Sequence, residues 1–436
     1  MIRALLHFFR LEHIRHFMTL FSSSLLGQGL ALAVAPILSR LYTPEDFGLA
    51  ALYLSLFSVM SVIATAKYEQ AIMLPREKEA AIHLFRLVIL LASGISLLFA
   101  LPLIVFNTQL AHLLGNAAIR PWLPVLPLSL LIHAALQAAT FYANRNKAFV
   151  PMARTSLLHQ LSASATKVGG GFLQWPANGL IVGQIAGQLA GMIHILSHSA
   201  RQISRQKLAF SMAQIREQAR RYSQYPRFNM LLSLTNNLSG SLPVFLFTMG
   251  FSAEVAGLYA FGYTFVFRPL GLFSQSTQQV LSQKMIETHH RGAPIYPALV
   301  TMVKRFAALG IIPLILFTIW APAIFSVVFS DAYEMAGRYL QIMSPWLFMV
   351  FLTSPLTFIH ELFFRQKTAM IIDIAYLFLR LLSLLAGIWL QDVMLALLLF
   401  SATGTVMVGY KLWWYLHLAR TAMIKIKGAK QVNGDN

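Results

Sequence analysis

Long apolar segments, about twelve of them, dominate this sequence and limit what it can fold into. The segment from Phe47 to Ala66 carries no formal charge. At 1.5 Å per residue, twenty helical residues reach about 30 Å, which is the thickness of the hydrocarbon layer of a bilayer. The segments are continuously apolar rather than alternating, which favours helices over barrel strands. The sequence therefore predicts an all-α integral membrane protein with about 12 transmembrane helices.

The composition agrees with that prediction. Of the 436 residues, 57% are hydrophobic and 11% are charged, whereas soluble domains carry about 25% charged residues. Such a chain cannot cover a surface that faces water. The sequence contains no cysteine, which excludes disulfides and thiolate metal sites. We place the spans at residues 17–40, 47–66, 81–106, 120–141, 155–174, 178–197, 229–249, 255–277, 298–322, 338–362, 368–390 and 393–416.

Basic residues set the expected orientation. A net charge of +19 would suggest nucleic acid as a partner of a soluble protein, but cytoplasmic loops of membrane proteins accumulate Lys and Arg. With a cytoplasmic N-terminus, most basic residues fall on the cytoplasmic side, and the opposite side keeps only Arg40, Arg120 and Arg338. We expect both termini in the cytoplasm and no nucleic-acid partner. Because the basic N-terminus lacks a convincing cleavage site, we interpret residues 17–40 as a retained helix rather than a signal peptide.

The sequence also repeats itself. The segment Thr43 to Leu49 recurs as Ser252 to Leu258, and Arg145-Asn146-Lys147 recurs as Arg365-Gln366-Lys367. Chance similarity is the alternative to a true repeat, because Gly and Glu are common where helices begin. Two parallel halves are the layout of alternating-access transporters, in which the substrate site lies between the halves. The predicted organisation is an N-lobe at 1–197, a basic cytoplasmic linker at 198–228, a C-lobe at 229–416 and a basic cytoplasmic tail at 417–436.

One stretch carries a family resemblance. SRLYTPEDFG at residues 39–48, followed by a helix and by AKYEQAIMLP at residues 66–75, resembles the oligosaccharide flippases of the multidrug/oligosaccharidyl-lipid/polysaccharide exporter superfamily. The resemblance implies two six-helix lobes around a central cavity. It also implies translocation of an undecaprenyl-diphosphate-linked oligosaccharide repeat unit across the bacterial inner membrane, for O-antigen, capsule or another surface polysaccharide. The expected partners are this substrate, the bilayer, and a polysaccharide polymerase with its chain-length regulator.

Intramembrane cations are the first candidates for binding the anionic diphosphate of such a substrate. Arg268 lies in the eighth span directly before Pro269, and Gln275 continues its helical face. A guanidinium binds phosphate with two parallel hydrogen bonds. The resemblance supports this role, because members of the family place a cavity arginine on this helix. The alternative is an interfacial arginine that extends its side chain toward the membrane surface.

Three further cations are candidates with weaker support. Lys167 lies inside the fifth span and Arg380 inside the eleventh, and Arg40 ends the first span. The alternative for Lys167 is a deprotonated, inert side chain. Arg380 has a structural alternative, in which a carboxylate such as Asp373 holds it. Arg40 is either a cation at the cavity exit or an interfacial anchor that pairs with Glu45 or Asp46.

Amide side chains complete the predicted substrate site. Asn236 and Asn237 lie on a polar stripe of the seventh span, and Gln28 lies on a weaker stripe of the first. They suit sugar hydroxyls or a coupling cation, and interhelical hydrogen bonding is the alternative. In the sixth span Gly183, Gly187 and Gly191 predict close helix packing.

Three other functions remain as alternatives. A cation-coupled small-molecule exporter of the same fold needs carboxylates in its lobes, but the buried charge here is mainly positive. A membrane polysaccharide polymerase needs a large periplasmic loop, which the predicted topology lacks, and a scaffold role would leave the intramembrane arginines unexplained. No catalytic, metal-ligand or phosphate-loop pattern is present. We therefore expect no enzymatic activity and no cofactor, with transport driven by a proton gradient, a cation gradient or the membrane potential.

Overall fold

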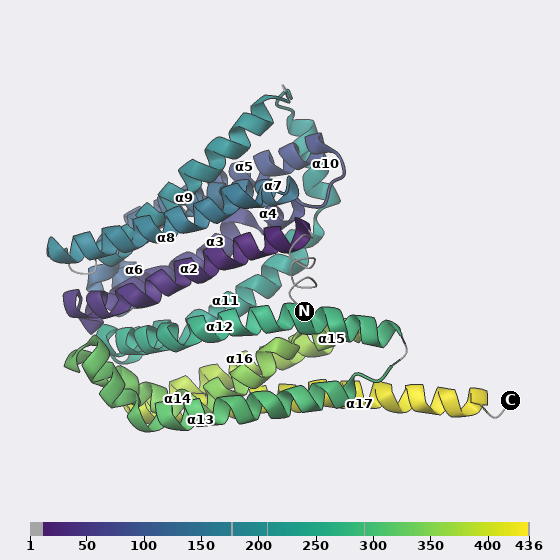
Figure 1. Ribbon diagram of the computed structural model, residues 1–436. Helices are drawn as coiled ribbons and strands as arrows, with labels where there is room; N and C mark the ends of the chain where they lie inside the picture. The colour runs from purple at the N-terminus through teal and green to yellow at the C-terminus, as the bar shows by residue number, and fades with distance from the viewer. Residues whose placement is uncertain (1–11, 176–177, 207, 292, 435–436) are drawn as a thin grey trace. The chain divides into compact units, whose positions relative to one another are not determined.

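The computed structural model describes the backbone of residues 12–175, 178–206, 208–291 and 293–434. Side chains are described for residues 25–175, 179–206, 208–274, 276–278, 281–288, 291 and 293–424. Within these ranges every regular element is a helix (Figure 1). The chain forms two compact units, Met1–Gly257 and Leu258–Asn436, here called the first and second units.

The first unit contains most of the helices. Its elements are α2 (Glu12–Leu41), α3 (Pro44–Thr65), α4 (Tyr68–Ala71), α5 (Lys78–Val105), α6 (Asn107–Leu113), η1 (Ala117–Val125), α7 (Leu126–Arg145), α8 (Phe149–Phe172), α9 (Asn178–Ser204), α10 (Met212–Arg221), the π-helical turn η2 (Tyr225–Asn229), α11 (Met230–Gly250) and the first turn of α12 (Ala253–His290).

The second unit contains the remainder of α12 and the helices that follow it. These are α13 (Tyr296–Phe329), η3 (Asp331–Tyr333), α14 (Glu334–Thr353), η4 (Ser354–Leu356), α15 (Phe358–Leu362), α16 (Gln366–Trp389) and α17 (Val393–Gly434). Rings of Phe261, Phe325, Phe329 and Tyr333 pack with centroids 4.5–6.2 Å apart and join α12 to α13 and η3.

Nine segments within the described ranges are long and apolar enough to cross a membrane. The remaining three predicted spans coincide with the long helices α2, α8 and α12, and the part of α2 whose side chains are described, Leu25–Leu41, is a shorter apolar helix. Each predicted span therefore corresponds to a long helix, and the prediction of an all-α, multi-pass membrane protein is confirmed. The predicted lobe boundary at residue 229 stays a prediction. The compact units divide after Gly257 because α11 packs along α3 in the first unit.

The start of α3 shows how the motif builds a helix. The Thr43 hydroxyl accepts a hydrogen bond from the Asp46 backbone N–H at 3.3 Å, and the Asp46 carboxylate accepts one from the Thr43 N–H at 3.0 Å. This reciprocal capping box satisfies two backbone donors that a helix start leaves open. Pro44 follows at the first helical position, where its missing N–H costs nothing. Thr43 to Asp46 therefore cap the start of α3.

The second copy of the motif begins α12 in a similar way. The Ser252 hydroxyl accepts from the Val255 N–H at 3.2 Å. The glycines that occupy equivalent places in the two copies, Gly48 and Gly257, make a reciprocal contact within the first unit. A Cβ on Gly48 would lie 1.8 Å from the Ala253 carbonyl oxygen, and a Cβ on Gly257 would lie 1.8 Å from that of Pro44. Only glycine allows the two helix starts to approach this closely.

Glycines also join α8 to α9, as the small-residue face of the sixth span predicts. A Cβ on Gly187 would lie 2.6 Å from the His159 carbonyl oxygen, and one on Gly183 would lie 2.9 Å from that of Ala163. Tyr42 packs beside these helices and donates a hydrogen bond to the Lys167 carbonyl oxygen at 2.7 Å. Burial, with a smaller contribution from Asp46, raises the pKa of Tyr42 to about 12, so the hydroxyl keeps its proton at neutral pH.

This packing gives a first prediction. Gly187→Leu should lower the apparent melting temperature of the purified protein in detergent, because overpacking costs about 1–3 kcal/mol and here the clash is with backbone. Gly169→Leu on α8 is the matched control, since a Cβ at Gly169 meets no atom within 4 Å. Equal melting temperatures for the two variants would show that the α8–α9 contact is looser than described.

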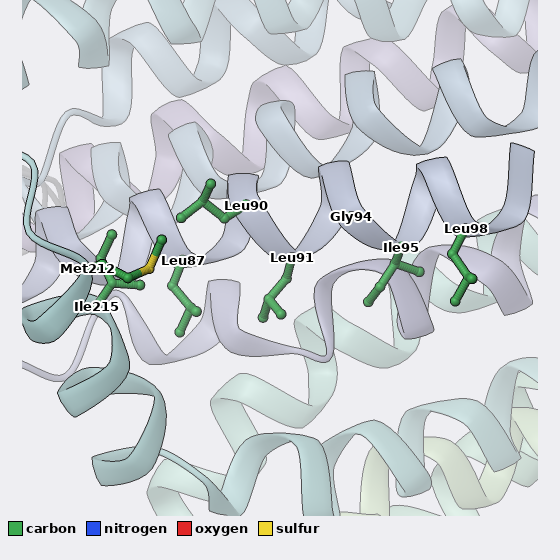
Figure 2. Close-up of a pocket in the computed structure, with 8 residues that line it drawn as sticks. All are labelled: Leu87, Leu90, Leu91, Gly94, Ile95, Leu98, Met212 and Ile215. Atoms are coloured by element: carbon green, nitrogen blue, oxygen red, sulfur yellow. The ribbon is translucent and has the colours of Figure 1, made fainter.

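The helix α10 is short and does not span the membrane. It packs on α5, where Ile215 joins a buried cluster with Leu84, Leu87 and Val88. An apolar groove runs beside this contact, with the side chains of α5 along its length and those of α10 at one end (Figure 2).

Candidate functional site

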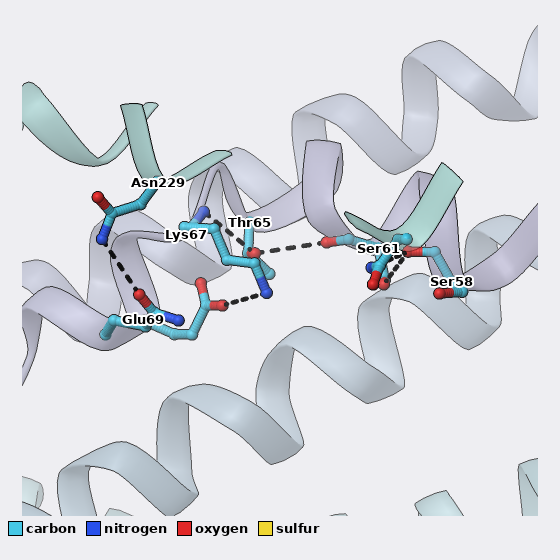
Figure 3. A network of polar contacts seen from close by, with 8 residues as sticks. Ser58, Ser61, Thr65, Lys67, Glu69 and Asn229 are labelled. Atoms are coloured by element: carbon cyan, nitrogen blue, oxygen red, sulfur yellow. Dashed lines mark hydrogen bonds and ion pairs between the residues drawn. The ribbon is translucent and has the colours of Figure 1, made fainter. Parts of the chain in front are cut away.

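A polar network forms in the first unit where α3 ends and α4 begins (Figure 3). Ala66 and Lys67 adopt left-handed backbone angles, with φ of 46° and 61°, and turn the chain sharply. The turn brings the Lys67 ammonium to 3.7 Å from a Glu69 carboxylate oxygen. Glu69 is only 3% exposed, so its charge needs this neighbour. Lys67 and Glu69 therefore form a half-buried ion pair.

The turn η2 and the helix α11 contribute amides to the same region. Asn237 donates from Nδ2 to the Ser58 carbonyl oxygen on α3 at 3.1 Å. Asn229 donates to the Gln70 side chain at 3.4 Å. Asn236, the neighbour of Asn237, is exposed. The predicted polar stripe thus divides between two roles, because Asn237 binds another helix and Asn236 presents its amide at the surface.

Three other predicted residues lie apart from this network. Arg40 is exposed and donates to the Pro36 carbonyl oxygen at 2.8 Å. Asp46, one of the two carboxylates named as alternative partners of Arg40, accepts from the Thr43 N–H. Gln28 and Lys167 are half-buried on α2 and α8. The stem of Lys167 lies against Gly183, where a Cβ would meet its Cγ at 2.4 Å.

Arg268 lies on α12 in the second unit and is exposed. Pro269 follows it inside the helix. Within the part of the chain that the structure describes, no hydrogen bond or ion pair is found for its guanidinium. Gly271, one turn further along, has open space where a Cβ would point. The side chain of Gln275, predicted to share this face, lies outside the described residues. Arg268 is therefore an exposed guanidinium with no carboxylate partner among the described residues.

Arg380 has a different environment. It is 7% exposed, and its guanidinium carbon lies 4.4 Å from the ring centroid of Phe400, 5.1 Å from Tyr376 and 5.3 Å from Trp346. These rings belong to α17, α16 and α14, so cation–π contacts join the three helices around one charge. Asp373, which shares the predicted helical face of Arg380, accepts a hydrogen bond from Lys411 at 2.5 Å. The alternative in which a carboxylate holds Arg380 stays a prediction.

Comparison with known proteins identifies the family. Residues 37–338 match the family model described as "Polysaccharide biosynthesis protein", which covers more than half of the chain. The chain belongs to the polysaccharide biosynthesis protein family. No curated protein sequence matches it significantly. The resemblance of the motif at residues 39–75 is thereby confirmed.

Solved structures show which fold this family member adopts. An inward-closed structure of the lipid II flippase MurJ is 14% identical, with a TM-score of 0.71 over 96% of this chain and 93% of MurJ. An inward-facing multidrug resistance MATE transporter of the MOP superfamily is 12% identical, with a TM-score of 0.69 over 92% of this chain and 95% of the transporter. A mutant of the Vibrio cholerae MATE transporter VcmN is 14% identical, with a TM-score of 0.59 over 93% and 95%.

These proteins share the all-helical fold with this family member, and they are a flippase and transporters rather than enzymes. The prediction that the protein is not an enzyme agrees with the comparisons.

The ion pair between Asp373 and Lys411 was missed by sequence reasoning. Lys411 lies within a predicted span, and an intramembrane charge is a functional or structural signal in its own right. The position of Lys411 within a predicted span was therefore sufficient to identify it as a candidate residue. Its partner was not evident, because the two residues lie on different helices, α16 and α17.

This pair gives a second prediction. Asp373→Asn should lower the melting temperature, since it leaves Lys411 without its partner. The cost should fall between the value of about 0–1 kcal/mol for exposed pairs and about 3–5 kcal/mol for buried ones. The double variant Asp373→Asn/Lys411→Met should recover most of the loss, because no unpaired charge remains. A double variant that is less stable than the single would show that the residues act independently of each other.

Proposed function

We propose that this protein translocates an undecaprenyl-diphosphate-linked oligosaccharide repeat unit from the cytoplasmic to the periplasmic leaflet of the bacterial inner membrane. The product would serve the synthesis of O-antigen, capsule or another exopolysaccharide, and the mechanism would be alternating access. Two comparisons support the proposal: the family is named for polysaccharide biosynthesis, and the fold is that of a flippase for the lipid-linked substrate lipid II.

One observation about the chain itself carries the proposal. Arg268 is an exposed guanidinium on a membrane helix, and the described residues offer it no carboxylate. Holding such a charge inside a membrane is costly and is found where it serves a substrate or an ion. A diphosphate supplies the missing negative charge, and the planar guanidinium matches its oxygens.

The other predicted residues fit supporting roles in this proposal. Asn236 presents an exposed amide, and Gln28 a half-buried one, each able to bind sugar hydroxyls. Lys167 would add a second cation for the diphosphate. Asn237 and Arg380 suit structural roles better, since Asn237 binds Ser58 and aromatic rings enclose Arg380. A proton gradient, a cation gradient or the membrane potential would drive transport.

A second function is favoured by one comparison, the similarity to a multidrug transporter. Export of cationic drugs by ion exchange needs carboxylates that are available to a cation. Here Glu69 lies next to Lys67, and Asp373 is bound to Lys411. Lysine ammonium groups therefore already neutralise both carboxylates, which makes an anionic substrate the better match.

A deletion strain separates the two functions. Restoring the gene should restore surface polysaccharide, measured by gel electrophoresis of the extracted polymer, and should leave resistance to cationic drugs unchanged. Restored drug resistance without restored polymer would favour the exporter and contradict the proposal.

A further inference from the structure

The groove between α5 and α10 is a built feature of the first unit with a volume of about 380 Å³. Its walls are apolar: Leu87, Leu91 and Leu98 from α5, and Met212 and Ile215 from α10 (Figure 2). Gly94 forms part of its floor, and a Cβ there would meet no atom within 4 Å. The absence of a side chain at Gly94 therefore keeps the groove open.

Arg86 fixes the helix that closes one end of the groove. Its guanidinium donates to the Ala209 carbonyl oxygen at 2.7 Å and to the Leu208 carbonyl oxygen at 2.8 Å. It also lies 5.8 Å from the ring centroid of Phe210. These contacts hold the segment that enters α10 against α5. Arg86 and the buried contact of Ile215 with α5 therefore both hold α10 beside the groove.

The length of the groove matches one leaflet of a bilayer. The eleven residue-to-residue steps from Leu87 to Leu98 rise about 16 Å along α5. This is about half of the 30 Å hydrocarbon thickness of a bilayer. A single acyl chain that enters beside α10 would therefore lie along α5 and end near the membrane midplane.

The helix α10 has the character of an interfacial helix with a cationic face. Phe210 and Met212 are exposed apolar side chains, whereas Ile215 is buried against α5. Arg216, Arg220 and Arg221 are exposed, and Glu217 is the single acidic residue of the helix. Met212, Arg216 and Arg220 follow one another at spacings of four, so they share one stripe of the helix. The cations therefore begin one turn away from the groove.

We propose that this groove binds an anionic phospholipid of the leaflet that faces α10, with one acyl chain along Leu87 to Leu98 and the headgroup phosphate at Arg216 and Arg220. Interfacial helices with basic faces bind anionic lipids through this combination of apolar burial and charge. In the predicted orientation the leaflet is the cytoplasmic one. This lipid site is separate from the proposed transport function. An experiment that contradicts one of the two proposals leaves the other unaffected.

Native mass spectrometry of the full-length protein tests the proposal, with phosphatidylglycerol and phosphatidylethanolamine of identical acyl chains as probes. The wild type should retain phosphatidylglycerol more strongly. Arg216→Gln/Arg220→Gln should reduce that retention about 25-fold, or about fivefold for each arginine, and leave phosphatidylethanolamine unchanged. Gly94→Phe adds a ring to the lining of the groove at a position where a Cβ meets no atom within 4 Å, and it should reduce retention of both lipids.

Two controls keep the test decisive. Leu97→Phe on the same helix is the matched control, because Leu97 is 75% exposed and lies outside the groove; its retention of both lipids should equal that of the wild type. Leu98→Trp fills the far end of the groove and provides a second blocking variant should Gly94→Phe be produced poorly.

Unchanged phosphatidylglycerol retention in the blocking variants would overturn the proposal. Displacement of phosphatidylglycerol by an equal amount of undecaprenyl phosphate would overturn it as well, since the occupant would then be a polyprenyl lipid.

Discussion

Replacing Arg268 by alanine is expected to reduce surface polysaccharide by about 10- to 100-fold at an unchanged level of protein. The physical reason is the loss of charge-assisted hydrogen bonds to the diphosphate, each of which contributes about 1.5–3 kcal/mol. Arg268 is exposed, and the substitution removes no hydrogen bond or ion pair found among the described residues. The measurement is the amount of polymer in a deletion strain that carries each variant.

Two control variants separate phosphate binding from a general effect of charge. Arg268→Lys keeps the positive charge but loses the planar guanidinium that can donate two parallel hydrogen bonds to a phosphate. This variant should therefore give an intermediate amount of polymer. Arg338→Ala removes an arginine that is also exposed but is paired with Glu334 at 2.8 Å, and it should leave the polymer unchanged. Normal polymer from Arg268→Ala at normal protein level would remove this residue from the mechanism.

The second large effect is expected at the contact between the two copies of the motif. Gly48→Leu or Gly257→Leu should abolish stable, functional protein, because even a Cβ would lie 1.8 Å from a backbone carbonyl oxygen. An additional methylene in a well-packed core costs about 1–3 kcal/mol, and a clash with backbone exceeds that range because no side chain can turn aside. The yield of monodisperse protein and the melting temperature in detergent measure the effect.

Gly29→Leu on α2 is the matched control for this contact, since a Cβ at Gly29 meets no atom within 4 Å. It should give a normal yield. Normal yield and stability for both Gly48→Leu and Gly257→Leu would mean that the helix starts do not approach as closely as the structure indicates.

Most of the fold was predictable because its signals are local. The apolar residues from Phe47 to Ala66 and the capping residue Thr43 are adjacent in the sequence, and the bounds of α3, Pro44–Thr65, agree with them. The helix α10 was not recognised inside the predicted linker at 198–228. A ten-residue amphipathic helix carries no hydropathy signal of a span, and its position depends on Arg86, more than a hundred residues away in the chain.

The candidate site was predictable only in part, because side-chain partners come from distant segments. The sequence alone singled out Arg268 and, with weaker support, Arg380 as intramembrane cations. The structure separates them: Arg268 is exposed, whereas Arg380 is enclosed by rings from three helices. No local sequence pattern predicts that Trp346 and Phe400 lie around Arg380. None predicts that Asp373 forms an ion pair with Lys411. Assignments of this kind need the tertiary packing.

The central claim is translocation of a lipid-linked sugar, and the leaflet in which that sugar resides tests it most directly. Spheroplasts of the deletion strain can be treated with a membrane-impermeant, sugar-cleaving reagent, and the cleaved fraction of undecaprenyl-diphosphate-linked saccharide measured. The account predicts that the saccharide accumulates in a protected, cytoplasmic pool without the protein and becomes cleavable when the wild-type gene is restored. An equal cleavable fraction with and without the protein would contradict it.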